Sequence, residues 1–226
     1  GTLVIAISER KNEITIFYKN IKYHLKRTDE VLRKANAHIQ MLEKQRELFD
    51  ENITKLNNLE LRNYPSLHQA ISVIQKGKLI QKISGDLKKY VLELGNEGTL
   101  LKTRLKEIVT DVDKETNLVI KDYTKLDLKK SKIMLDTLHY DEILDQENII
   151  NALAYENQIH NSSIKGWRIL SKTSLHEQDI AKLIKELGTL GNAIHSNLSI
   201  YTHILGDIKA KEFKFEVERI KLNSYN

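Results

Sequence analysis

The amino-acid sequence predicts a mainly α-helical protein, with a short β segment first, then an elongated helical bundle and a C-terminal pair of helix-hairpin-helix units. Three observations predict this fold class. One proline and nine glycines in 226 residues leave room for long uninterrupted helices. Apolar residues recur in steps of three, four and seven from Thr28 onward. After Lys165, glycines separate short apolar segments.

The apolar run of residues 3–7 predicts a strand that is covered on both faces. Alternating apolar residues in 14–18 and 21–25 predict two further strands, with Lys19 and Asn20 as a tight turn between them. Three short strands do not form a stable domain alone. We therefore expect the larger part of an α/β domain to precede this segment.

The segment from Thr28 to about Leu61 predicts one helix of roughly 33 residues, about 50 Å long. Thr28 and Asp29 suit its first turn, and Pro65 ends the segment. Its apolar stripe needs the following helices packed against it. The stripe consists of Leu32, Ala35, Ile39, Leu42, Phe49, Ile53 and Leu56.

The next segments predict further helices joined by short polar breaks, which pack as antiparallel neighbours. A second long helix is expected from Leu67 to Leu94, loosened near Gly77 and Gly85. A third is expected from Leu100 to Val109.

The middle of the chain is less regular. Residues 118–120 fit either a short strand or a buried helical turn. The lysine-rich run 121–132 is typical of a solvated face, and residues 133–154 predict one or two helices. Asn161–Ser163 is the expected linker.

The last part of the chain predicts two helical hairpins. Residues 177–187 and 190–195 form the first, with Gly188 in the left-handed position that ends a helix. Residues 199–204 and a last helix from Asp207 form the second, with Gly206 between them.

Composition excludes several classes of site. There is no cysteine, which excludes a disulfide, a thiolate nucleophile and a cysteine-ligated zinc. No glycine-rich phosphate loop occurs, and the eight histidines lack the i, i+4 pairing of metalloproteases. The net charge of +5 permits a polyanionic partner without requiring one.

We expect core or partly buried positions for the aromatic residues Phe17, Tyr18, Tyr23 and Trp167.

Two stretches suit phosphate binding. In the connection from Ser8 to Asn12, a serine hydroxyl lies beside Arg10, although an ordinary polar hairpin explains these residues equally well. In the second stretch, Gly206 precedes a helix whose first N–H groups, at Ile208 and Lys209, are free for an anion. Lys209 and Lys211 add positive charge there. The alternative is an ordinary glycine turn between two helices.

Taken in order, several stretches resemble the DisA family of bacterial DNA integrity scanning proteins. Residues 3–12, 14–18 and 20–23 are similar to the end of the family's diadenylate cyclase domain. Later landmarks of the family are matched by Lys34–Asn36, Ile39–Gln40, Leu42–Lys44, Tyr90–Gly95, Glu97–Gly98, Ile120–Tyr123, Gly166–Leu170 and Leu187–Leu190.

The resemblance implies a cytoplasmic, nucleoid-associated bacterial protein. The family condenses two ATP molecules into cyclic di-AMP and pyrophosphate with Mg²⁺ or Mn²⁺, in an octamer. Its C-terminal domain binds branched DNA, which reduces cyclase activity. By this resemblance the chain divides into a cyclase-domain remnant (1–27), a helical linker or scaffold (28–160) and a helix-hairpin-helix DNA-binding domain (161–226).

The chain also departs from the family. The Asp-Gly-Ala and Arg-His-Arg motifs of catalysis are absent, so this chain is expected to be inactive alone and to need no metal or cofactor. Only Ser8 and Arg10 carry over as nucleotide-binding residues. The family's Gly-hydrophobic-Gly hairpin becomes Ile204-Leu205-Gly206, and a β-branched residue disfavours a positive φ. We therefore expect weakened DNA binding, and the alternative function is an oligomerisation scaffold with neither DNA binding nor catalysis.

Overall fold

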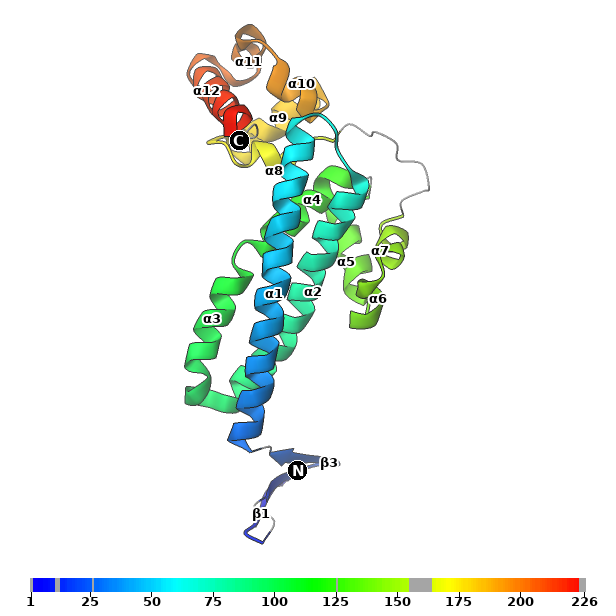
Figure 1. The fold of residues 1–226 in the computed structure, drawn as a ribbon, viewed down its shortest axis with the longest axis vertical. Coiled ribbons are helices and arrows are strands. Elements are labelled where there is room, and N and C mark those ends of the chain that lie inside the picture. Colours follow the sequence, from blue (N-terminus) through cyan, green and yellow to red (C-terminus); the bar gives the residue numbers. More distant parts are fainter. Residues whose placement is uncertain (1, 11–12, 26, 125, 155–163, 224–226) are drawn as a thin grey trace. The chain divides into compact units, whose positions relative to one another are not determined.

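The structure is a computed structural model that describes residues 2–10, 13–25, 27–124, 126–154 and 164–223. The predicted fold class is confirmed, because long helices follow a short three-stranded sheet (Figure 1). Contacts divide the chain into two compact units. The first unit is Gly1–Lys44 with Lys82–Val109, and the second is Gln45–Gln81 with Thr110–Asn226. The expected linker at 161–163 lies outside the described residues.

The three predicted strands form an antiparallel meander in the order β1-β2-β3. The strands are β1 (Leu3–Ser8), β2 (Glu13–Tyr18) and β3 (Ile21–Leu25). Lys19 turns the chain between β2 and β3 with a φ of 52°, which confirms the predicted tight turn.

The covering expected on both faces of β1 is not provided by the described residues. Leu3, Val4 and Ile5 are each more than half exposed, and successive residues of a strand point to opposite faces. The aromatic residues of this sheet, for which we expect core or partly buried positions, are not in a core, whereas Trp167 is half-buried as expected. The exposed fractions are 37% for Phe17, 44% for Tyr18 and 46% for Tyr23.

Helix α1 (Thr28–Leu61) has the predicted length and a buried stripe. Val31 takes the place expected for Leu32, which is half-buried, as is Ile53. The chain leaves the helix through Asn63, whose φ is 59°, just before Pro65. The buried apolar residues are Val31, Ala35, Ile39, Leu42, Phe49 and Leu56.

Helix α2 (Leu67–Leu94) is continuous, so the loosening expected near its glycines is wrong. Gly77 instead permits a close approach of α4, because a Cβ there would lie 2.1 Å from the Thr116 hydroxyl oxygen. A 3-10 turn (Gly95–Gly98) leads into α3 (Thr99–Val109), as predicted.

The ambiguous residues 118–120 are helical, since they belong to α4 (Val112–Tyr123), and Val119 and Ile120 are buried. Three short helices follow where the sequence predicts one or two: α5 (Leu128–Thr137), α6 (Tyr140–Leu144) and α7 (Gln146–Ala152).

The C-terminal part begins with the single turn α8 (Trp167–Leu170) and continues with two helical hairpins, as predicted. The first is α9 (Glu177–Leu187) with α10 (Leu190–His195), and the second is α11 (Leu198–Leu205) with α12 (Asp207–Asn223). The edge of the Tyr201 ring contacts the Phe213 ring at 5.0 Å, and the Tyr201 hydroxyl donates to the Ala193 carbonyl. The ring contact packs α11 against α12 within the second hairpin, and the Tyr201 hydroxyl joins this hairpin to α10 of the first.

Candidate nucleic-acid interface

Gly206 connects the two helices of the second hairpin in a conformation that favours glycine. Its φ is +82°, and its N–H donates to the Thr202 carbonyl at 2.9 Å. A Cβ at this position would meet no atom within 4 Å. Backbone conformation, and not crowding, is therefore the reason for a glycine here. The turn leaves the start of α12 exposed, with Ile208 78% exposed.

Ile204 does not carry the strain expected from the sequence. It lies inside α11, and it is not among the described residues with a positive φ. A β-branched residue is compatible with helical backbone, so the expected conformational cost at this position is wrong. Only the second glycine position of the motif, Gly206, needs the left-handed region here.

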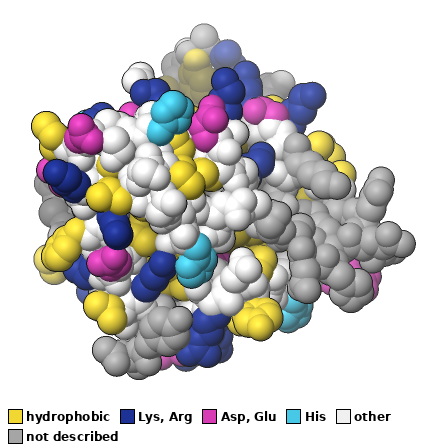
Figure 2. All heavy atoms as spheres, turned by 90° about the horizontal axis from the view of Figure 1, so that it is seen from above, with side chains coloured by type: hydrophobic (Ala, Val, Ile, Leu, Met, Phe, Trp, Pro, Cys, Tyr) yellow, Lys and Arg dark blue, Asp and Glu magenta, His cyan; other side chains and the backbone are white. Residues whose placement is uncertain are grey.

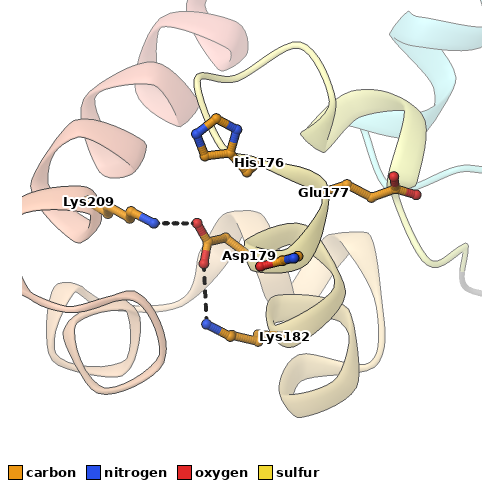
Figure 3. Close-up of a pocket in the computed structure, with 6 residues that line it drawn as sticks. His176, Glu177, Asp179, Lys182 and Lys209 are labelled. Atoms are coloured by element: carbon orange, nitrogen blue, oxygen red, sulfur yellow. Dashed lines mark hydrogen bonds and ion pairs between the residues drawn. The ribbon is translucent and has the colours of Figure 1, made fainter.

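Lys209 is exposed, and its ammonium group points toward a carboxylate of the first hairpin (Figure 3). Its Nζ donates to Oδ2 of Asp179 at 2.6 Å, and Lys182 pairs with Oδ1 of the same carboxylate at 3.4 Å. The hydrogen bond from Lys209 holds the pKa of Asp179 below its ordinary value. These three residues line a pocket of about 520 Å³ together with His176, Glu177 and Gln178.

The other predicted DNA-binding lysine, Lys211, is exposed on α12. The structure therefore brings Gly206, Ile208, Lys209 and Lys211 together at the start of one helix. It gives the two lysines different surroundings, because Lys209 is ion-paired and Lys211 faces solvent.

A buried ionic cluster that the sequence did not reveal lies below α8. The Arg168 guanidinium donates to Glu60 and Asn57, and the side chains of Arg168 and Glu60 have no exposed surface. The Tyr123 hydroxyl donates to the other oxygen of Glu60 at 3.0 Å. Burial raises the pKa of Glu60 to about 7, and it also raises the pKa of Tyr123.

Asp122 belongs to the same cluster and caps α8. Its two carboxylate oxygens accept the backbone N–H groups of Gly166, Trp167 and Arg168 at 2.9, 2.7 and 2.9 Å. Burial nevertheless raises the pKa of Asp122. One signal could have found Glu60, because it continues the stripe of α1 four residues after Leu56. Asp122 directly follows Lys121, and Arg168 lies three residues after Lys165, so no local pattern marks either charge as buried.

Comparison with known proteins places this architecture in a family. Residues 25–162, which include α1 to α7, match the family described as DisA bacterial checkpoint controller linker region. The chain belongs to the DisA family. The DNA integrity scanning protein DisA of Bacillus subtilis (strain 168) is 32% identical over 235 aligned residues, which cover 100% of this chain and 65% of the relative. That of Clostridium botulinum (strain Alaska E43 / Type E3) is 33% identical over 229 residues, covering 98% and 65%. The chain thus spans about 65% of the length of these DisA relatives.

The two nucleotide-binding residues that the DisA resemblance implied lie at the β1–β2 connection. Ser8 ends β1 opposite Glu13 and is half-buried, and Arg10 is exposed in the turn that follows. This connection is a hairpin between antiparallel strands, which is the alternative left open by the sequence. Residues 11 and 12 lie outside the described part of the chain.

Surface charge on this DisA chain is mixed. The face seen in Figure 2 carries hydrophobic, basic and acidic side chains side by side. Within the described residues, no group of three or more histidine, aspartate or glutamate side chains is placed to hold a metal ion, so no metal step is derived for them. None of the described helices has the length and hydropathy that crossing a membrane requires.

Proposed function

We propose that the second hairpin of this chain binds the DNA backbone without reading sequence. Gly206 would let a phosphate approach closely, and the first-turn N–H groups of Ile208 and Lys209 would donate to it. Lys209 and Lys211 would neutralise charge. The observation that carries the proposal is the left-handed Gly206 at the exposed entry to a 17-residue helix.

The relatives support the same proposal, because they are named DNA integrity scanning proteins. For the whole protein we propose the family reaction, in which two ATP molecules give cyclic di-AMP and pyrophosphate with Mg²⁺ or Mn²⁺. The helical region would act as the scaffold of a homo-oligomer, an octamer in the family. Ser8 and Arg10 would contact nucleotide, and DNA binding would restrain the cyclase.

Salt dependence of binding tests the DNA contact. Replacing Lys209 and Lys211 together by alanine should lower the slope of log affinity against log salt by up to about 2, because each lost phosphate contact releases about one counterion fewer. The matched control is Lys129→Ala with Lys130→Ala, two exposed lysines of α5 that change the net charge equally. An unchanged slope in the first variant would remove these lysines from the interface.

One observation favours a second function. Lys209 is already paired with Asp179, which withdraws a cation from the proposed phosphate site. The alternative is a helical oligomerisation scaffold with neither DNA binding nor catalysis. Titrating a labelled Holliday junction and a duplex of equal length at low salt separates the two functions. Tighter binding of the junction supports the branched-DNA function, and a stable oligomer that binds neither supports the scaffold.

A further inference from the structure

Helix α12 carries apolar side chains on two opposite faces. One face is buried in the hairpin core, where Phe213 is 0% and Val217 is 4% exposed. The opposite face presents three large apolar side chains to solvent. Their exposed fractions are 78% for Ile208, 69% for Phe215 and 69% for Leu222.

The three exposed residues form a straight stripe. Positions seven apart lie on nearly the same side of an α-helix, so Ile208, Phe215 and Leu222 follow one line of about 21 Å. Exposed apolar residues that repeat every seven positions on one face suit packing against another helix, with the charged residues between them at the edges of the contact. The core contacts of α12 do not need it, because they use the other face.

Charged residues border the stripe in a balanced pattern. Lys211 and Glu218 lie on one side of it, and Glu212 and Arg219 lie on the other, all exposed. Two positive and two negative charges cancel on this face, although the whole chain carries +5. Such a face suits a polyanion poorly along most of its length, and it suits a partner with the same balanced pattern.

We infer that α12 pairs with α12 of a second copy of this chain, with Phe215 packing against Phe215. In an antiparallel pair, Lys211 neighbours the other copy's Glu218, and Glu212 neighbours its Arg219. In a parallel pair, Lys211 neighbours Glu212, and Glu218 neighbours Arg219. Opposite charges therefore meet across the pair in both directions, and this self-complementarity identifies the second copy as the occupant.

The size of the stripe sets the strength of the pair. Two helices of 17 residues in contact along one face bury less than the ~1,200 Å² of a standard stable interface. The pair is therefore weak and reversible. Pairing is a separate activity from the proposed DNA contact. It also covers Lys211, so the two would compete. The tests below contain no nucleic acid and leave Gly206, Lys209 and Lys211 intact, which keeps the two proposals separately testable.

The absence of cysteine from the chain allows a direct test in the full-length chain. Phe215→Cys introduces the only thiol. In a parallel or an antiparallel pair, this thiol lies opposite the same thiol of the second copy. Leu144→Cys, at a position on α6 that is 53% exposed, is the matched control. Under the same mild oxidation, we expect the disulfide-linked dimer to form at least about tenfold faster at position 215. Equal rates at the two positions would overturn the proposal.

Sedimentation equilibrium gives a second readout. Phe215→Asp removes the central apolar contact, and Arg219→Glu brings like charges together in either direction. Each should weaken the association step that α12 adds, beyond any oligomer that the helical region holds, at least about tenfold, which corresponds to 1.4 kcal/mol. Leu144→Asp and Lys130→Glu are the matched controls and should leave it unchanged. Because positions 215 and 219 are exposed, the thermal midpoint should be retained. Self-association as strong as in the parent chain, in a folded Phe215→Asp variant, contradicts the pairing.

Discussion

Asp179 forms ion pairs with Lys182 of the first hairpin and Lys209 of the second, close to the proposed DNA contact. Replacing it by asparagine keeps the side-chain shape and removes the charge that attracts Lys209 and Lys182. Lys209 should then be free to reach a phosphate. We expect Asp179→Asn to bind DNA several-fold more tightly at low salt, with a slope of log affinity against log salt that is steeper by about 1. Fluorescence anisotropy over a salt series measures both quantities.

The control for this prediction is Asp86→Asn, which breaks the exposed ion pair of Asp86 with Lys89 and changes the net charge equally. It should raise affinity only through the general charge of the chain. If Asp179→Asn and Asp86→Asn behave alike, Lys209 is not a phosphate ligand.

Glu60 gives the protein a specific pH dependence. Its pKa of about 7 in the folded chain exceeds its ordinary value of 4.5, so the folded chain holds this proton more tightly. The free energy of unfolding should therefore fall as pH rises from about 4.5 to about 7. Glu60→Gln should flatten this part of the profile, as measured by urea denaturation at several pH values.

The same variant should lower stability at pH 8, where Glu60 is largely ionised, by about 2 kcal/mol, because it removes the charge-assisted hydrogen bond that Arg168 donates to Glu60. Arg168 keeps Glu115 as an acidic neighbour at 3.9 Å. Glu186→Gln, at an exposed position of α9, is the control and should change neither the slope nor the stability. A parent chain whose stability does not fall between pH 4.5 and 7 would contradict this assignment.

At the residue scale, the sequence predicts which apolar residues of a helix are buried better than it predicts the partners of charged residues. Periodicity predicts that α1 buries Phe49 and Leu56, but it does not predict that Glu60, four residues after Leu56, is buried as well. Glu60 is buried together with its partner, Arg168. The two residues are 108 positions apart in the sequence, so no local pattern reveals the pair. Likewise, the ion pair of Lys209 depends on a carboxylate from another hairpin.

At the scale of elements, α8 depends on a cap from a different helix. Asp122 of α4 accepts three backbone N–H groups at its start, which a four-residue helix cannot satisfy internally. Asp122→Ala should cost at least about 3 kcal/mol, because it leaves buried donors without acceptors. The midpoint of urea denaturation measures this loss.

Asp127 provides a matched comparison. It is an exposed N-cap of α5 and accepts one N–H group, from Lys129, so Asp127→Ala should cost only about 1 kcal/mol. Equal losses in the Asp122 and Asp127 variants would mean that Asp122 acts as an ordinary cap and does not link α4 to α8.

The elements that the sequence predicts well are those with strong local signals. Glycines at 188 and 206 separate the hairpin helices, and both have a positive φ. The sequence predicts only one or two helices over residues 133–154, because the boundaries of α5 to α7 depend on caps such as Asp127 and Asp145 within a polar segment. A single-turn helix such as α8 carries no periodicity at all.

At the scale of the whole molecule, the DisA resemblance and the contacts divide the chain differently. The resemblance predicts separate domains at 28–160 and 161–226. The second compact unit instead joins both hairpins to Gln45–Gln81 and to the chain from Thr110 onward. Two buried acids explain this union, because Glu60 and Asp122 find their partners at residues 166–168.

A chain ending at Ala154 tests which division governs stability. Without the hairpins, Asp122 loses the amides of α8, and Glu60 loses Arg168 and keeps the Tyr123 hydroxyl. The parts of α1 and α4 that carry these acids then lose their contacts with α8. Hydrogen exchange should then accelerate at least about tenfold in the second half of α1 and in α4, while α3, which belongs to the other unit, should exchange as before. Unchanged exchange in α1 and α4 would instead mean that the hairpins fold independently of the linker, as the family division predicts.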